Sequence, residues 1–283
     1  MLCGLIVCAS LCAEPGPNIE DVTQVSIPPN AVERVVRFRP LGRVKTAREY
    51  FIEDERIGRR EFYDNRNVAV EMLYRDGKLH GLSRQFYLSA KLYAERPYRN
   101  GVMHGEFKFW DEEGTLMGAS RIENGTGLLR EFKQPNTSSI DAETPYRDSR
   151  KHGKVKTWGN FADCEGLGFQ ASNYIEGRLE GPSVVRHGDG LLLSWSWFSN
   201  GDLHGQVTHL TRDGQVGPGY PVYFVRGRRV TELEMKDAAE RDPELAKTLT
   251  FRPETNEPVP ESPSQAFNKK KAAAKAKSVE ARN

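Results

Sequence analysis

The chain of 283 residues has few cysteines, and this scarcity limits how its fold can be held together. Three of the four, Cys3, Cys8 and Cys12, lie in the first dozen residues, and Cys164 alone lies beyond them. Once an N-terminal signal segment is cleaved, Cys164 alone remains and cannot form an intramolecular disulfide, so the body of the chain has no disulfide framework. We therefore expect its stability to come from hydrogen bonds and apolar packing.

The chain also has little continuous hydrophobic sequence, and its mean hydropathy is −0.64. The apolar run 2–13 is shorter than the roughly 20 residues that cross a bilayer, but it matches the core of a secretion signal. We expect 1–13 to be a signal peptide and the protein to be exported to the periplasm, envelope or medium. No basic residue precedes the run and Leu11 fits a cleavage site poorly, so a cytoplasmic protein is the alternative.

Several motifs of catalytic sites are missing. The sequence has no serine in a nucleophile-elbow pattern, no phosphate-binding glycine loop and no His-Glu-x-x-His. The acidic run 111–113 falls in a predicted turn, where solvated carboxylates are the simpler interpretation. Cys164 has acidic neighbours that disfavour its thiolate. These observations predict a protein that is not an enzyme and uses no cofactor.

A strong charge of one sign is confined to the end of the chain. Residues 268–283 carry a balance of +5, which leaves −3 for the others because the net charge is +2. The body is therefore not a basic nucleic-acid surface, and we expect no specific nucleic-acid partner. The lysines from Lys269 to Lys277 could contact an anionic lipid or polymer. The composition of 250–283 favours a solvated, disordered Lys/Ala-rich tail.

What the sequence has in abundance is a repeat. The dipeptide His-Gly takes four of the six histidines, at His80-Gly81, His104-Gly105, His152-Gly153 and His204-Gly205. Successive copies are 24, 48 and 52 residues apart. This spacing indicates a unit of about two dozen residues, and such periodicity predicts a stacked, quasi-one-dimensional fold.

Aligning the units on the glycine of the dipeptide, position zero, reveals further columns. The zero positions are Gly58, Gly81, Gly105, Leu129, Gly153, Gly181 and Gly205. An aromatic residue stands seven positions earlier in six of the seven units. Four positions earlier lies a glycine in five units: Gly77, Gly101, Gly125, Gly177 and Gly201. Asn-Gly and Asp-Gly pairs favour tight hairpin turns, and the alternation over 106–109 is typical of a half-buried strand.

The segments YRDGKLHG, YRNGVMHG, YRDSRKHG and FSNGDLHG resemble the MORN repeat, and among its variants the bacterial YwqK-type antitoxin family. The resemblance covers about 50–231, with Leu128-Leu129 and Glu180-Gly181 as departures from the dipeptide. It implies an all-β fold, an elongated single-layer antiparallel sheet of about seven stacked hairpins. It also implies a protein that binds partners or associates with itself.

The flanks of the array have their own signals. Residues 14–49 form a proline-containing lead-in, with a short edge strand expected near 35–38. Thr231 and Glu234 fit a helix capping box, and Asp242 before Pro243 fits a second helix start. We therefore expect short helices over 232–249 that cap the last hairpin.

Two columns are candidate sites. The histidines could bind a metal, but residues in one column lie two strands, roughly 9–10 Å, apart, too far to share one ion. We expect turn histidines and no metal. Five positions after zero lie Tyr63, Phe86, Trp110 and Trp158. Repeated aromatics in a sheet are more often core, but Trp110 and Trp158 are the best candidates for a binding face.

The sequence thus predicts a non-catalytic scaffold that binds an unidentified protein partner or a second copy of itself through the open sheet. Two alternatives stay open. One is neutralisation of a toxin, suggested by the resemblance alone, and the other is binding of an anionic membrane or surface polymer, suggested by the lysine tail.

Overall fold

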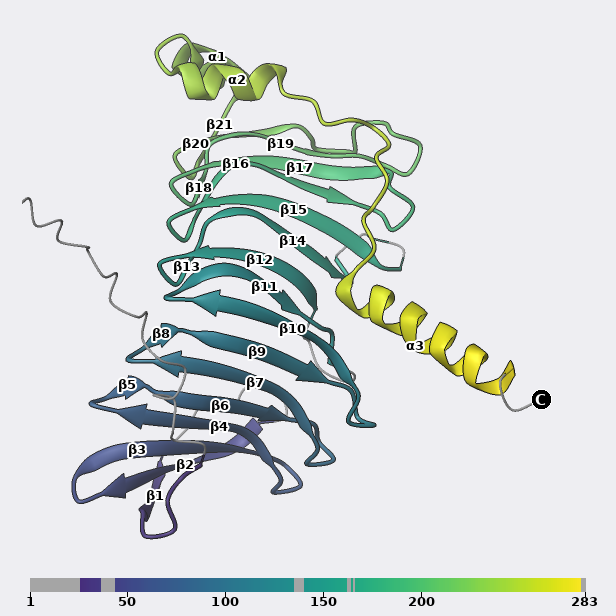
Figure 1. Ribbon diagram of the computed structural model, residues 1–283. Coiled ribbons are helices and arrows are strands. Elements are labelled where there is room, and N and C mark those ends of the chain that lie inside the picture. The colour runs from purple at the N-terminus through teal and green to yellow at the C-terminus, as the bar shows by residue number, and fades with distance from the viewer. Residues whose placement is uncertain (1–25, 37–43, 135–139, 162–163, 165, 281–283) are drawn as a thin grey trace, which may run out of the picture.

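The protein forms one long open sheet in which each strand runs antiparallel to its neighbours (Figure 1). A computed structural model describes residues 26–36, 44–134, 140–161, 164 and 166–280. Over these residues it contains 21 strands and three helices. The prediction of an elongated all-β sheet of hairpins is confirmed. The expected signal segment 1–13 and the lead-in up to residue 25 lie outside the described residues.

The strands follow one another across the sheet in chain order. They are β1 (Val32–Val36), β2 (Val44–Ile52), β3 (Glu55–Tyr63), β4 (Val68–Arg75), β5 (Lys78–Leu79), β6 (Gly81–Phe86), β7 (Leu92–Arg99), β8 (Val102–Met103), β9 (Gly105–Trp110), β10 (Leu116–Glu123), β11 (Thr126–Glu131), β12 (Asp141–Arg147), β13 (Arg150–Lys151), β14 (Gly153–Gly159), β15 (Gly168–Ile175), β16 (Arg178–Arg186), β17 (Leu192–Ser199), β18 (Asp202–Leu203), β19 (Gly205–His209), β20 (Val222–Val225) and β21 (Arg228–Val230). The helices are α1 (Glu232–Ala239), α2 (Pro243–Thr250) and α3 (Pro263–Glu280).

The Asn-Gly and Asp-Gly pairs form the hairpin turns that their chemistry predicts. Both residues of Asn100-Gly101 have positive φ, 49° and 85°. This is the geometry of a type I′ turn, which joins twisted antiparallel strands and favours asparagine followed by glycine. Asp148 and Ser149 adopt the same conformation, at 50° and 60°, although neither is glycine. The hairpin geometry therefore persists where the glycine column is interrupted.

At the His-Gly dipeptide the chain begins to pair with the next hairpin. Met103 pairs with Tyr98 inside its own hairpin, whereas Gly105 pairs with Ile122 of the following hairpin. Gly105 has a φ of +124°, and a Cβ there would lie 2.8 Å from Cγ of Pro97. This position requires glycine because a side chain would be strained and would collide with the adjacent strand.

Two of the expected zero positions are corrected by the strand register. Gly127, not Leu129, pairs with the column aromatic Tyr146, because this hairpin lacks the two-residue bulge found in the second, third, fifth, sixth and seventh units. Gly58 pairs with Leu73, so Ile57 is the residue opposite the column aromatic in the first unit. A register shift between β2 and β3 accounts for this one-residue difference.

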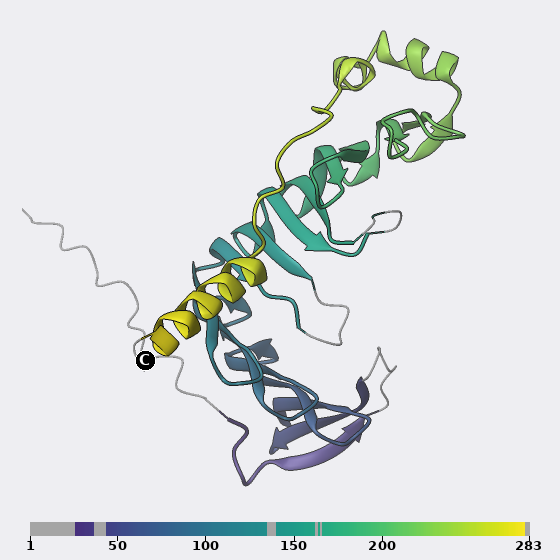
Figure 2. The ribbon, with the colours of Figure 1, turned by 90° about the vertical axis from the view of Figure 1, so that its right-hand side faces the viewer.

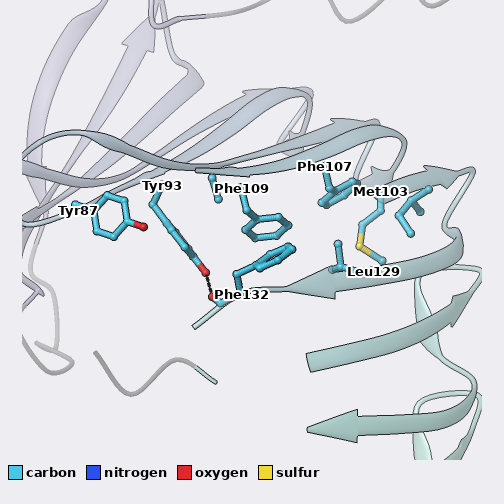
Figure 3. Close-up of a cluster of buried hydrophobic side chains, with 9 residues drawn as sticks. Tyr87, Tyr93, Met103, Phe107, Phe109, Leu129 and Phe132 are labelled. Atoms are coloured by element: carbon cyan, nitrogen blue, oxygen red, sulfur yellow. Dashed lines mark hydrogen bonds between the residues drawn. The ribbon is translucent and has the colours of Figure 1, made fainter. Parts of the chain in front are cut away.

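The largest apolar core lies in the middle of the array (Figure 3). Tyr93 lies edge-on to Tyr87 and to Phe109, with ring centroids 5.4 and 5.7 Å apart. Phe107 and Phe109 are fully buried. Because neighbouring hairpins contribute to one cluster, no hairpin buries its aromatic residues alone, which is why the repeats must stack.

Different elements close the two ends of the sheet. At the first end β1 pairs along β2, so an edge strand is present close to its expected position. At the other end Met235 of α1 and Leu245 of α2, both fully buried, pack against the last hairpin. The Thr231–Glu234 capping box and the Asp242 N-cap both form as the sequence predicts.

The C-terminal segment, expected as a disordered Lys/Ala-rich tail over 250–283, contains a helix in its described part, and residues 281–283 lie outside that part. Residues 251–262 run back from the end of the array along one side of the sheet, and α3 follows them (Figures 1 and 2). We refer to 251–280 as the strap. It contacts Asp111 after β9, Lys133 after β11, Trp158 at the end of β14 and Arg186 at the end of β16, and we refer to this edge of the sheet as the second-turn edge. The hairpin turns lie at the opposite edge.

Candidate interaction surface

Three of the four histidines in the column tie one hairpin turn to the next. The backbone N–H of the following turn donates to a histidine Nδ1 at Asn100 to His80 (3.3 Å), Asn124 to His104 (3.1 Å) and Arg226 to His204 (3.2 Å). Where the dipeptide is Glu180-Gly181, the Glu180 carboxylate accepts the equivalent bond from Asn200 at 2.7 Å. The column therefore supplies hydrogen-bond acceptors between turns.

The electrostatic surroundings of His104 suit that structural role. Burial, together with the charge of Arg99, lowers the pKa of His104 and so favours the neutral ring, in which Nδ1 can accept a hydrogen bond. His152 departs from the pattern because its buried Nδ1 has no hydrogen-bond partner among the described residues. Among the residues that the structure describes, no three His, Cys, Asp or Glu side chains lie close enough together to bind one metal ion.

The aromatic residues proposed as a binding face divide into two groups. Trp158 is 1% exposed and packs on Phe169, and the buried Tyr63 donates its hydroxyl to the Phe86 carbonyl of the next unit at 2.7 Å. Tyr63 is therefore a core residue, which corrects its assignment to an open face, whereas Trp158 is covered by the Pro260 carbonyl of the strap. Phe86 and Trp110 are half-buried.

One face of the sheet carries a row of opposed charges along β3, β4, β6 and β7. Arg60 lies opposite Glu71, which lies opposite Arg84. The corresponding ion pairs measure 2.6 and 3.8 Å, and Arg84 reaches Glu95 at 3.0 Å. Cross-strand pairs of opposite charge stabilise a sheet by roughly 0.2–1 kcal/mol each. These charges satisfy one another within the sheet.

The extended part of the strap binds first through its backbone. The N–H of Leu192 donates to the Thr255 carbonyl at 2.9 Å, and the N–H of Glu257 donates to the Gly190 carbonyl at 3.3 Å. A Cβ on Gly190 would lie 2.5 Å from the Glu257 carbonyl oxygen, so glycine is needed for this close approach. The loop after β16 thus holds the strap like a short additional strand.

A buried arginine reinforces that contact. Arg186 is 3% exposed, and its guanidinium donates to the Glu254 carbonyl at 2.9 Å and to the Glu257 carboxylate at 2.8 Å. Loss of these partners would destabilise the protein, because the charge of the buried arginine would be left without compensation in a poorly solvated environment. Nearby, Phe251 packs on Trp197 with ring centroids 5.2 Å apart.

The middle of the strap meets two specific side chains of the sheet. The indole N–H of Trp158 donates to the Pro260 carbonyl at 2.7 Å. Asp141, 4% exposed, accepts the hydroxyls of Ser262 at 2.7 Å and Ser264 at 2.5 Å, and also the Lys133 N–H at 2.9 Å. One carboxylate therefore fixes the start of α3 to the sheet.

α3 itself makes one apolar and one ionic contact. Phe267 packs against the central aromatic core, and Lys271 Nζ lies 2.5 Å from Asp111 and 3.2 Å from Glu113. Burial alone would raise the pKa of Asp111. The hydrogen bonds from Lys271 and from the Thr115 N–H outweigh burial and hold that pKa below its usual range. The acidic turn therefore acts as a receptor for a cation.

These contacts hold the chain's own C-terminal segment on the second-turn edge. The sequence located the acidic turn 111–113 but gave no sign that Lys271 would face it, since 160 positions separate Lys271 from Asp111. No family model and no curated protein matches this chain. Among the described residues, no helix is both long and apolar enough to cross a membrane.

Proposed function

We propose that this protein is a non-catalytic MORN-like scaffold that binds a segment of another protein along its second-turn edge. The observation that carries the proposal is that this edge already holds an extended segment and a helix, the strap. The contacts combine backbone pairing at Gly190 with side-chain recognition at Trp158, Asp141 and Asp111.

This division of contacts suits a recognition surface. Backbone hydrogen bonds hold any extended peptide, whereas buried polar side chains discriminate, because an unmatched partner leaves them without hydrogen bonds. The Trp158 N–H requires a carbonyl, the Asp141 carboxylate requires donors, and the acidic turn requires a cation. A toxin or a second copy of the chain would be particular cases of such a partner.

The proposal is tested by comparing recovered partners from the source cells with full-length wild-type and edge-variant proteins. Asp111→Lys reverses the cation-binding turn, and Asp64→Lys makes the same charge change in the exposed loop after β3. The scaffold proposal expects a partner that wild type and Asp64→Lys retain and Asp111→Lys loses. Equal recovery by all three proteins would contradict binding at this edge.

A second candidate function is attachment to an anionic surface. α3 projects past the edge of the sheet, and Lys269, Lys270, Lys275 and Lys277 are exposed along it (Figure 1). Flotation with vesicles containing phosphatidylserine would show binding that the variant Lys270→Glu/Lys277→Glu loses. Wild-type protein that fails to float at low salt would exclude this function.

A further inference from the structure

The side chains of α3 do not fill the space between this helix and the sheet. Between α3 and the second-turn edge lies an open cavity of about 420 Å³. Its apolar walls are Tyr87, Met117 and Phe267, its acidic rim is Asp111 to Glu113, and Asn268 and Lys271 of α3 border it. A larger apolar side chain at the position of Asn268 would gain dispersion contacts with Tyr87 and Met117 that asparagine does not make.

The strap also uses little of its helix. Phe267 and Lys271 make the contacts described above, whereas residues 272–277 are exposed, on the end of α3 that projects past the edge of the sheet (Figure 1). The three lysines Lys269, Lys270 and Lys271 stand together, but only Lys271 reaches the acidic turn. The sheet therefore holds the first part of α3, up to Lys271, and makes few contacts with the rest of the helix.

We propose that α3 is a replaceable occupant of the partner site, and that the partner is a helix of another protein carrying a larger apolar side chain at the position of Asn268 and a cation at that of Lys271. This inference rests on the proposed function and names the partner that displaces the strap. A second copy of the chain fits less well, because an identical strap would leave the same cavity empty.

The chemistry of the site specifies the rest of the partner. Its helix begins with hydroxyl donors that match Asp141, as Ser262 and Ser264 do. One turn later an aromatic side chain enters the central core, as Phe267 does. Leucine or methionine beside it would extend into the cavity between Tyr87 and Met117.

The experiment uses the full-length chain with fluorescein-labelled peptides of sequence 258–280. The host variant Lys271→Glu places a carboxylate against Asp111 and Glu113 and so loosens the chain's own strap, while Lys270→Glu is the matched host. The probes are the unchanged peptide, an Asn268→Leu peptide that fills the cavity, and an Asn268→Ala peptide that keeps helix propensity without filling it.

The proposal expects the Asn268→Leu peptide to bind the Lys271→Glu host at least tenfold more tightly than the Asn268→Ala peptide, and to bind the Lys270→Glu host more weakly. Equal affinity of the leucine and alanine peptides would overturn the larger partner and leave the scaffold standing. No binding by any peptide would overturn both. A peptide-free Lys271→Glu host that sediments as a dimer would instead identify a second copy as the occupant.

Discussion

Removing the carboxylate of Asp141 should release the strap while leaving the sheet intact. Asp141 accepts hydrogen bonds from Ser262, Ser264 and Lys133, and the Ser262 hydroxyl is fully buried. Hydrogen bonds to a charged group contribute about 1.5–3 kcal/mol each, and three that share one carboxylate are not additive. We therefore expect Asp141→Ala to weaken docking of α3 by about 3 kcal/mol, or roughly 150-fold.

Hydrogen exchange of the full-length protein measures this effect. Amides of 266–271 should lose protection in Asp141→Ala, while the amides of β6 and β7 should keep theirs. Asp237→Ala, an exposed change on α1, is the control and should alter neither region. Unchanged exchange in α3, or equal loss across the sheet, would refute the idea that Asp141 holds the strap.

Three further predictions concern the repeat and the acidic turn. Gly105→Ala should lower the free energy of unfolding by about 2–4 kcal/mol, because a side chain here would be strained by the positive φ and would also meet a proline ring. Gly114→Ala is the control: its φ is also positive but the space around it is open, so it should lower that free energy by about 1–2 kcal/mol. Equal losses for the two variants in chemical denaturation would contradict this. Ser149→Gly should raise that free energy by about 1 kcal/mol by relieving its positive φ, and a lowered denaturation midpoint would contradict this. The pKa of Asp111 is lowered in the folded protein, so its ion pair with Lys271 stabilises α3 docking above the ordinary aspartate pKa of about 3.9, and this stabilisation is lost below it. Protection of the α3 amides from hydrogen exchange should therefore be constant from about pH 8 to 5 and fall in more acidic solution. A fall already near pH 6 would contradict the assignment.

The sequence predicted the hairpins because their signals are local. Asn100-Gly101 specifies a turn through its own backbone preferences, and the His-Gly bulge recurs often enough to define the unit. The alignment of the repeats was wrong where a unit departed from the pattern. Gly127 replaces Leu129 at position zero because the fourth hairpin lacks the two-residue bulge, a change that composition cannot reveal.

The candidate site could not be predicted because it depends on contacts between distant parts of the chain. Ser262 meets Asp141 across 121 positions, and a Lys/Ala-rich segment looks disordered when its receptor is unknown. Trp158 shows the same limit, since the aromatic column fixed its place in the repeat but not the Pro260 carbonyl that covers it. Low-complexity composition predicts disorder only when no surface elsewhere matches the segment.

The central claim is that the second-turn edge binds a helix-bearing segment that exchanges with the strap. The most direct test is hydrogen exchange of the full-length protein with and without excess Asn268→Leu peptide of 258–280. The claim predicts that residues 263–271 of the chain become deprotected, while residues 111–115 and 132–134 stay protected because the peptide replaces α3 there. Protection that is unchanged by saturating peptide, or that changes only at the hairpin turns of the opposite edge, would contradict it.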